Sequence, residues 1–187
     1  MSTIFDIDFK LNKDTWRLLD DLYKSLLRTT SVIRLEKSDS PHILDKTFSI
    51  DVLLKQQNGM VFTVQEKVRR YEYIEYDQWT LEYYSNHPKK IEGEWFKLCT
   101  DLYSTIFLTP NQKAIAKGYI FWTTPVKHAI LFNKLKTEFK IQSKHSKASF
   151  FAYNFSDFKD DWFLWRYLNP VAGQLPLSQF EKGREVS

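Results

Sequence analysis

The sequence of 187 residues carries 27 Lys and Arg against 23 Asp and Glu, a net charge of +4, and a single cysteine. This length suits one folded domain with a core of its own. The lone Cys99 excludes an internal disulfide and any zinc site built from paired cysteines. The small positive charge permits a nucleic-acid partner without requiring one. Aromatic residues make up 17% of the chain, which indicates a strongly aromatic core or, as the alternative, rings that stack on bases.

The terminal segments and the hydropathy pattern predict where the protein is located and how it is divided into domains. The N-terminus lacks the basic region, apolar stretch and cleavage site of a secretory signal, and no apolar run approaches the roughly 18 residues of a membrane span. We therefore expect a soluble, cytoplasmic protein with no membrane partner. Residues 1–168 are predicted to form a single domain, and residues 169–187, first rich in proline and then polar, a C-terminal tail. The sequence leaves a homodimer open.

Hydrophobic periodicity and turn residues predict an α/β protein with a mixed central sheet. In chain order we expect a helix capped by Asp14, strands over 48–56, 60–70 and 78–84, a short helix over 93–100, strands over 102–108 and 114–123, a helix from Thr124, a strand over 150–155 and a helix capped by Ser156. The first helix has an apolar face of Trp16, Leu19, Tyr23, Leu26 and Leu27. The apolar face of the helix from Thr124 is expected to consist of His128, Leu131, Phe132, Leu135 and Phe139. The first three strands are expected to be antiparallel neighbours.

Polar residues interrupt two neighbouring predicted strands, and they are the informative part of the sequence. Asp51 stands in the first of these strands, and Gln65-Glu66-Lys67 stands in the second, fourteen residues later. Unpaired polar groups in the middle of a buried strand cost several kcal/mol, so a fold keeps them only with partners or for a function. A satisfied structural network of these side chains is the alternative to a functional site.

The length of the hairpin loop decides which of these side chains project together. Because side chains alternate between the two faces of a strand, a three-residue loop over 57–59 places Asp51, Gln65 and Lys67 on one face and Glu66 on the other. A loop one residue shorter would set Asp51 opposite Glu66. We expect the three-residue loop, with a bulge at its glycine, because it keeps the apolar faces of the two strands matched.

An acid, an amide oxygen and a lysine on one face suit metal-assisted hydrolysis of a phosphodiester. The oxygens of Asp51 and Gln65 are ligands for a hard cation such as Mg²⁺ or Mn²⁺, which takes its remaining ligands from water and phosphate. The ammonium of Lys67 can position the attacking water and offset charge on the phosphate in the transition state.

The arrangement resembles the PD-(D/E)XK nuclease superfamily over residues 14–139. The superfamily motif is an acid, a short gap and then acid-any residue-lysine on the next strand, which Asp51, Gln65 and Lys67 match. The resemblance is to small phage-type members in particular, whose strand reads apolar-Thr-apolar-Gln-any-Lys and is followed by a basic stretch, here Arg69-Arg70. It implies a restriction-endonuclease-like fold of three layers, with a central mixed β-sheet flanked by helices.

The resemblance also implies roles for individual residues. Asp51, Gln65 and Lys67 would be catalytic, and Asp51 and Gln65 would bind the metal together with an acid of the first helix. Asp20, at the border of the apolar face of that helix, is the better candidate, and Glu36 is a poorer one. The chain departs from the superfamily pattern at two places, because Ile50 stands where a proline often precedes the acid and Gln65 replaces a carboxylate.

On this resemblance we expect a nuclease, dependent on Mg²⁺ or Mn²⁺, that hydrolyses DNA in phage or mobile-element biology. Arg69, Arg70 and Lys134 are the expected contacts to the nucleic acid. A catalytically inactive nucleic-acid-binding protein on the same fold is one alternative, favoured by Gln65. The other is a structural or protein-interaction module, favoured by the aromatic content and the modest charge.

Overall fold

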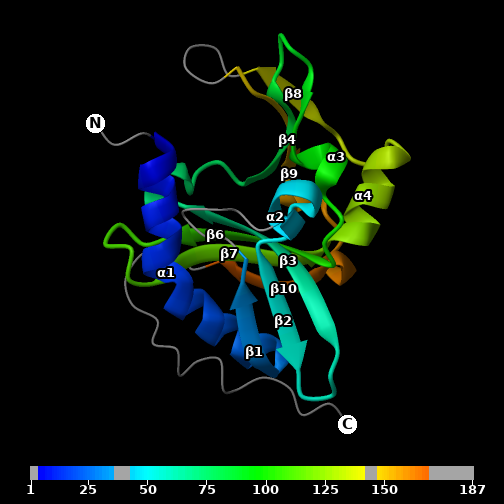
Figure 1. Ribbon diagram of the computed structural model, residues 1–187. Coiled ribbons are helices and arrows are strands. Elements are labelled where there is room, and N and C mark those ends of the chain that lie inside the picture. Colours follow the sequence, from blue (N-terminus) through cyan, green and yellow to red (C-terminus); the bar gives the residue numbers. More distant parts are fainter. Residues whose placement is uncertain (1–3, 36–42, 142–146, 169–187) are drawn as a thin grey trace.

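Two β-sheets and a long N-terminal helix organise the chain (Figure 1). The structure is a computed structural model that describes residues 4–35, 43–141 and 147–168, with the backbone alone for 4–14 and 141. Among the described residues, no helix combines the length and the apolar character needed to cross a membrane. The predicted tail over 169–187 lies outside the described residues, and the division into one domain and a tail stays a prediction.

The larger sheet has six strands in the order β1-β2-β3-β6-β7-β10. Their bounds are Thr29–Arg34 for β1, Val52–Gln56 for β2, Val61–Arg69 for β3, Leu102–Leu108 for β6, Ile115–Trp122 for β7 and Phe163–Leu168 for β10. Strands β3 and β6 are parallel, whereas every other neighbouring pair is antiparallel. The chain is therefore an α/β protein with a mixed central sheet, as the sequence predicts.

The smaller sheet is antiparallel and has the order β5-β4-β9-β8. Its strands are β4 (Gln78–Asn86), β5 (Ile91–Glu92), β8 (Glu138–Ile141) and β9 (Ser149–Asn154). Short helices α2 (Ile43–Phe48), α3 (Glu94–Lys97) and α4 (Thr123–Leu131) and the 3₁₀ turns η1 (Tyr71–Tyr73), η2 (Phe155–Asp157) and η3 (Asp160–Trp162) connect the strands. In Figure 1 this sheet rises from the larger one, with α2 and α3 near the junction.

Helix α1 (Ile4–Leu27) covers one face of the larger sheet. Its buried residues recur at helical spacing, and they pack against the alternate residues of β2, β3, β6 and β7 that face them. The buried set comprises Leu19, Leu22, Tyr23, Leu27, Val52, Leu54, Val64, Leu102, Ile106, Leu108 and Ile120. The remaining residues of β2 and β3 thus point to the opposite face of the sheet.

An aromatic core fills the space between the opposite face and the smaller sheet. Trp79 is fully buried at its centre, with ring centroids 5.2 Å from Tyr103 and 5.3 Å from Phe121. The ring of Tyr119 stacks on that of Phe155 at 3.8 Å. Much of the aromatic content therefore serves a core, which was the first of the two expectations.

The hairpin of β2 and β3 has the register that the three-residue loop predicts. Val52 pairs with Val64, and continuing that register sets Asp51 opposite Gln65. The Gly59 N–H donates to the carbonyl of Gln56, and Gly59 has φ +86°. This left-handed conformation favours glycine and closes the three-residue loop. The predicted loop is confirmed, and the shorter alternative is excluded.

In the first part of the chain, two predicted features are wrong and one strand was missed. The first helix begins at Ile4 rather than after Asp14. Residues 48–51 are not strand, because α2 extends to Phe48 and Ser49, at φ +52°, turns the chain before β2 begins at Val52. Strand β1 was not predicted, although it pairs with β2 along its length. The pairing supplies stability that the local sequence of β1 does not signal.

Three predicted features in the second half are also wrong. Strand β4 is not a third neighbour of the hairpin, since β3 pairs with β6 and β4 pairs with β9. The helix from Thr124 does not reach Phe139. It ends at Leu131. Just after this end, Asn133 adopts a left-handed conformation with φ +53°, and the Lys134 N–H donates to the carbonyl of Ala129, which is a common way for a helix to end. After Ser156 the chain forms 3₁₀ turns and strand β10 in place of a helix.

Candidate functional site

A polar hollow of about 500 Å³ opens where α2 and α3 meet strands β3 and β4. Two of the sequence-predicted site residues, Gln65 and Lys67, line it. Its full lining is Asp45, Lys46, Ser49, Gln65, Lys67, Glu82, Glu94 and Lys97. Both signs of charge thus meet in one hollow, on the face of the larger sheet away from α1.

Asp51 lies beside the hollow and is fixed by the backbone of β3. Its Oδ2 accepts the N–H of Glu66 at 2.8 Å, and its own N–H donates to the carbonyl of Val64 at 2.9 Å. The carboxylate is also close enough to Lys67 to raise the pKa of that ammonium. The structure therefore brings together Asp51, Gln65 and Lys67, the three residues predicted to be catalytic.

Lys67 is held in the hollow by a carbonyl and a carboxylate. Its Nζ donates to the Thr80 carbonyl at 3.1 Å and lies 3.8 Å from Glu94 Oε2. Burial lowers the pKa of Lys67, and Arg69 lowers it as well, whereas Glu94, Glu82 and Asp51 raise it by a smaller total amount. The net effect is a pKa of Lys67 below its ordinary value.

Two acids of the hollow, Glu82 and Glu94, escaped the sequence analysis. Glu82 comes from β4, and Glu94 comes from α3, the next element after the short strand β5. Gly93 allows the two to approach, because a Cβ there would lie 2.8 Å from both the Glu82 side chain and its carbonyl oxygen. An acid in the strand and a Gly-Glu pair at a helix start were the available signals. Neither reveals that the two segments meet.

Two oxygen atoms of the hollow are buried acceptors without a hydrogen-bond donor among the described residues. They are Oε1 of Gln65 and Oε1 of Glu94, although the Tyr103 hydroxyl lies near enough to the Glu94 carboxylate for the two to interact. A buried acceptor of this kind costs free energy unless a ligand, an ion or water satisfies it. The described residues hold no group of three or more His, Cys, Asp or Glu side chains that could bind a metal. A cation here would thus need the amide oxygen of Gln65 as well as carboxylates.

Glu66 lies on the other face of β3 in a second polar network. Its carboxylate is nearly buried and accepts hydrogen bonds at 2.8 Å from Tyr23 Oη and from Arg34 Nη1. The same guanidinium pairs with Asp20 Oδ1 at 2.8 Å. Asp20 therefore lies on the α1 side of the sheet, and the structure does not bring it together with the residues of the hollow. The alternative acid, Glu36, lies outside the described residues.

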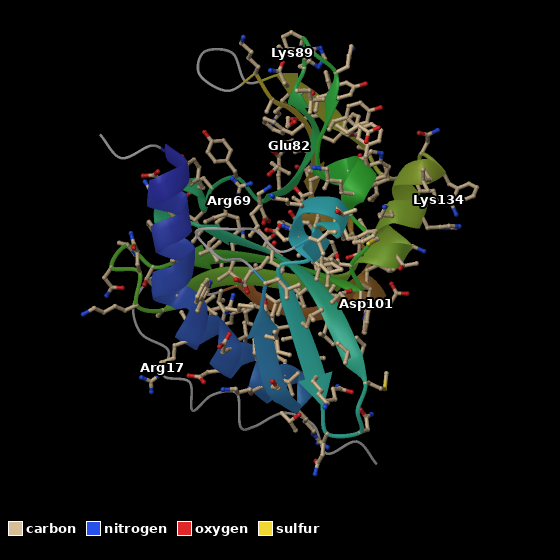
Figure 2. The ribbon with its side chains drawn as sticks, in the orientation of Figure 1. Arg17, Arg69, Glu82, Lys89, Asp101 and Lys134 are labelled. Atoms are coloured by element: carbon tan, nitrogen blue, oxygen red, sulfur yellow. The ribbon has the colours of Figure 1, made fainter. Side chains whose placement is uncertain are left out.

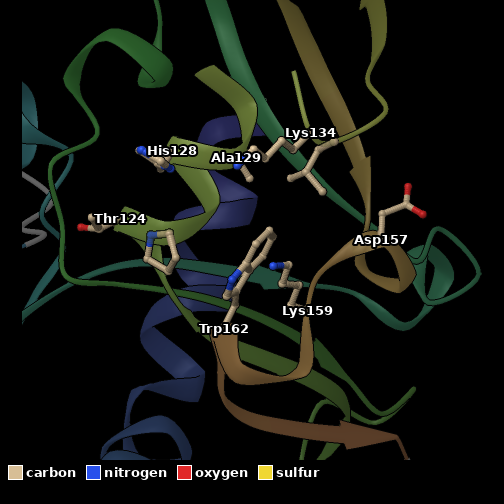
Figure 3. A pocket seen from close by; sticks show the side chains of 9 residues that line it. Thr124, His128, Ala129, Lys134, Asp157, Lys159 and Trp162 are labelled. Carbon is tan, nitrogen blue, oxygen red and sulfur yellow. The ribbon is translucent and has the colours of Figure 1, made fainter. Parts of the chain in front are cut away.

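The three predicted nucleic-acid contacts are not in one place (Figure 2). Arg69 lies near Lys67 and donates to the Thr80 hydroxyl. Arg70 follows β3 and precedes η1. Lys134 lies after α4 and lines a separate hollow of about 390 Å³ (Figure 3). Only the arginines remain close to the strand that carries the motif.

Comparisons with protein-family models, with curated proteins and with solved structures find no match.

Substitutions of Glu66 and Gln65, neighbours on opposite faces of β3, should differ in their effect on the free energy of unfolding. Glu66→Gln leaves the buried Arg34 with a weaker partner, so we expect the free energy of unfolding to fall by roughly 2–3 kcal/mol. Gln65→Ala, on the other face, should change it by less than about 1 kcal/mol. Urea denaturation monitored by tryptophan fluorescence measures both. An unfolding free energy for Glu66→Gln at or above that of Gln65→Ala would contradict the assignment of faces.

The charge of Glu82 should destabilise the fold at neutral pH. Burial raises the pKa of Glu82 above its ordinary value of 4.5, Glu94 raises it further, and Lys67 and Lys97 offset only part of the rise. The resulting loss of folding stability is full at pH values above the pKa of Glu82 in the folded state, and it is absent below the pKa of Glu82 in the unfolded state. We expect Glu82→Gln to raise Tm at neutral pH and to lose that gain well below pH 4.5. A lower Tm at neutral pH would contradict the expectation.

Proposed function

We propose that the protein is a DNA-hydrolysing nuclease dependent on Mg²⁺ or Mn²⁺, on a restriction-endonuclease-like fold. The observation that carries the proposal is the content of the polar hollow. The buried Oε1 atoms of Gln65 and Glu94 accept no hydrogen bond from the described residues, and they lie in one hollow with Lys67. Metal-assisted phosphodiester hydrolysis uses oxygen ligands, a group that positions the attacking water and a water-accessible space for the phosphate.

The donor atoms of the hollow fit a hard divalent cation. Asp51 and Gln65 would hold the ion, and Oε1 of Glu94 is the further oxygen that a cation would satisfy. The negative charges of Glu82 and Glu94 compensate for the neutral amide at the position of the usual acid. When bound, the ion would polarise a phosphate oxygen and stabilise charge in the transition state.

The residues of the chain perform the remaining parts of the reaction. The ammonium of Lys67 positions a water molecule whose oxygen forms the new bond to phosphorus, and the proton of that water passes to solvent. The bond from phosphorus to the leaving sugar oxygen breaks, and that oxygen takes a proton from solvent. Thr80 and Glu94 hold the Lys67 ammonium in place. Lys46 and Lys97 line the same hollow and attract the phosphate.

The choice of DNA as substrate depends on the resemblance of the motif. Asp51 and Gln65-Glu66-Lys67 match the PD-(D/E)XK pattern, and the arginine pair that follows keeps positive charge beside the motif. The mixed central sheet, with α1 on one face, is compatible with the fold of that superfamily. The net charge of +4 agrees with a polyanionic substrate.

Cleavage of single-stranded, duplex and branched DNA in Mg²⁺ and in Mn²⁺ tests the proposal. We expect Lys67→Met and Asp51→Asn to lower the rate about 10²- to 10³-fold, because each removes a group that acts on the transition state. Lys55→Met is the matched control, since Lys55 is an exposed lysine on the neighbouring strand β2, and it should cleave as the wild type does. Cleavage that persists in EDTA, or an unaffected Lys67→Met variant, would contradict the proposal.

The same experiment distinguishes the second candidate, an inactive nucleic-acid-binding protein. The amide of Gln65 favours it, because an amide attracts a divalent ion less strongly than a carboxylate does. DNA binding that weakens steeply with salt, without cleavage in either metal, would support this candidate and overturn the nuclease. Absence of both would leave the structural or protein-interaction module.

A further inference from the structure

Five aromatic rings of the smaller sheet and of α3 contact one another, and we call them the ring surface. They are Tyr83, Tyr84, Phe96, Phe139 and Phe151. Phe96 and Phe139 remain 43% and 46% exposed, whereas Phe151 also packs against the aromatic core. Exposed rings at this density are typical of a binding surface rather than of a monomer surface.

A β-bulge in β4 places two neighbouring tyrosines on the ring surface. Glu82 pairs with Phe150 and Tyr84 pairs with Ser149, so the register shifts between Glu82 and Tyr84. Without the bulge, consecutive residues would point to opposite faces of the strand. With it, the ring centroids of Tyr83 and Tyr84 are 4.6 Å apart. Bulges are frequent where a strand must redirect a side chain beside a site.

The ring surface and the polar hollow take residues from the same two elements, β4 and α3. Glu82 of the hollow is followed directly by Tyr83 on β4, and Glu94 is followed by Phe96 on the single helical turn of α3. Lys97, the last residue of α3, lines the hollow. The two elements that supply the acids of the candidate active site therefore also supply the rings.

Cations accompany the rings. Lys90 Nζ lies 5.1 Å from the centroid of the Tyr84 ring, and Lys89 is exposed at the tip of the β4–β5 hairpin (Figure 2). Neither lysine forms an ion pair with another described residue. The acids on this side are Glu92, which is exposed, and Glu138, which pairs with Lys140 at 2.8 Å. The surface thus combines flat apolar rings with two lysines and with one exposed acid, Glu92, which lies opposite Tyr84 in the sheet.

We propose that the ring surface binds unpaired bases of single-stranded DNA, so that the substrate of the nuclease is single-stranded or carries a single-stranded segment. Bases stack on aromatic rings irrespective of sequence, and lysines contact the backbone between them. A duplex hides its base faces inside its own stack, so exposed rings favour unpaired bases. This inference rests on the proposed function, because the hollow beside the rings would receive the scissile phosphate.

Fluorescence anisotropy with a labelled oligothymidylate of about 15 nucleotides and with a duplex of equal length tests the inference. The full chain carries Lys67→Met to prevent cleavage, and EDTA is present. Tyr84→Ala and Phe96→Ala should each weaken single-strand binding about 5- to 100-fold and duplex binding by less than about twofold. Tyr84→Phe keeps the ring and should bind as the parent does. Leu131→Ala, which removes an exposed apolar side chain from α4, is the matched control and should bind unchanged.

The salt dependence of binding separates stacking from charge. Lys89→Gln should make the slope of log K against log salt shallower by about 0.7, the value for one phosphate contact to a single strand. Tyr84→Ala should lower K and leave that slope unchanged, because stacking releases no counterions. Equal losses for single strand and duplex, unchanged single-strand binding in both alanine variants, or a self-association that the same variants abolish would overturn the inference. The last outcome would identify the surface as a protein interface.

Failure of this inference is distinguishable from failure of the proposed function. Ring-dependent single-strand binding without metal-dependent cleavage would support the ring surface and overturn the nuclease. Cleavage that requires Lys67, with single-strand affinity and rate unchanged in Tyr84→Ala and Phe96→Ala, would overturn the ring surface and support the nuclease. Circular dichroism of each variant checks that it is folded.

Discussion

The alternation of side chains along β3 is the constraint on which the rest of the structure depends. Val64 and Glu66 face α1, and Gln65 and Lys67 face the hollow. Because the period of a strand is two residues, a slip of one residue would bury Gln65 and Lys67 beneath α1 and expose the apolar residues. The three-residue loop at Gly59 prevents that slip, so the turn that closes the hairpin also determines the chemistry of each face.

The two polar faces of β3 differ in how their charges are satisfied. On the α1 side, Glu66 has hydrogen-bond donors from Tyr23 and Arg34 at 2.8 Å, so its charge is compensated within the fold. On the hollow side, the pKa of Lys67 is lowered and that of Glu82 is raised, mainly by burial. Each shift disfavours the charged form. Buried groups whose charged form is disfavoured are typical of functional sites, where residues are present for function rather than for stability.

Local pattern predicted the hairpin because its determinants lie within a few residues of one another: alternating apolar residues and a glycine that tolerates positive φ. It did not predict the partners of β4 or the existence of β1, since strand pairing over long separations leaves no local signal. The helical wheel placed Asp20 at the border of the buried face of α1. Its partner Arg34, however, comes from the unpredicted strand β1. Glu82 and Glu94 were missed for the same reason, because they lie on separate elements that approach each other only in the folded chain, at Gly93.

Direct titration of Mn²⁺ into the protein by calorimetry tests the central claim, that Gln65 rather than Glu66 belongs to the site. We expect the wild type to bind the ion and Gln65→Ala to weaken binding about tenfold or more. Glu66→Gln, measured at a temperature where it is folded, should keep the wild-type affinity. Loss of binding in Glu66→Gln with retention in Gln65→Ala would contradict the account, because it would place the functional oxygen on the opposite face of β3.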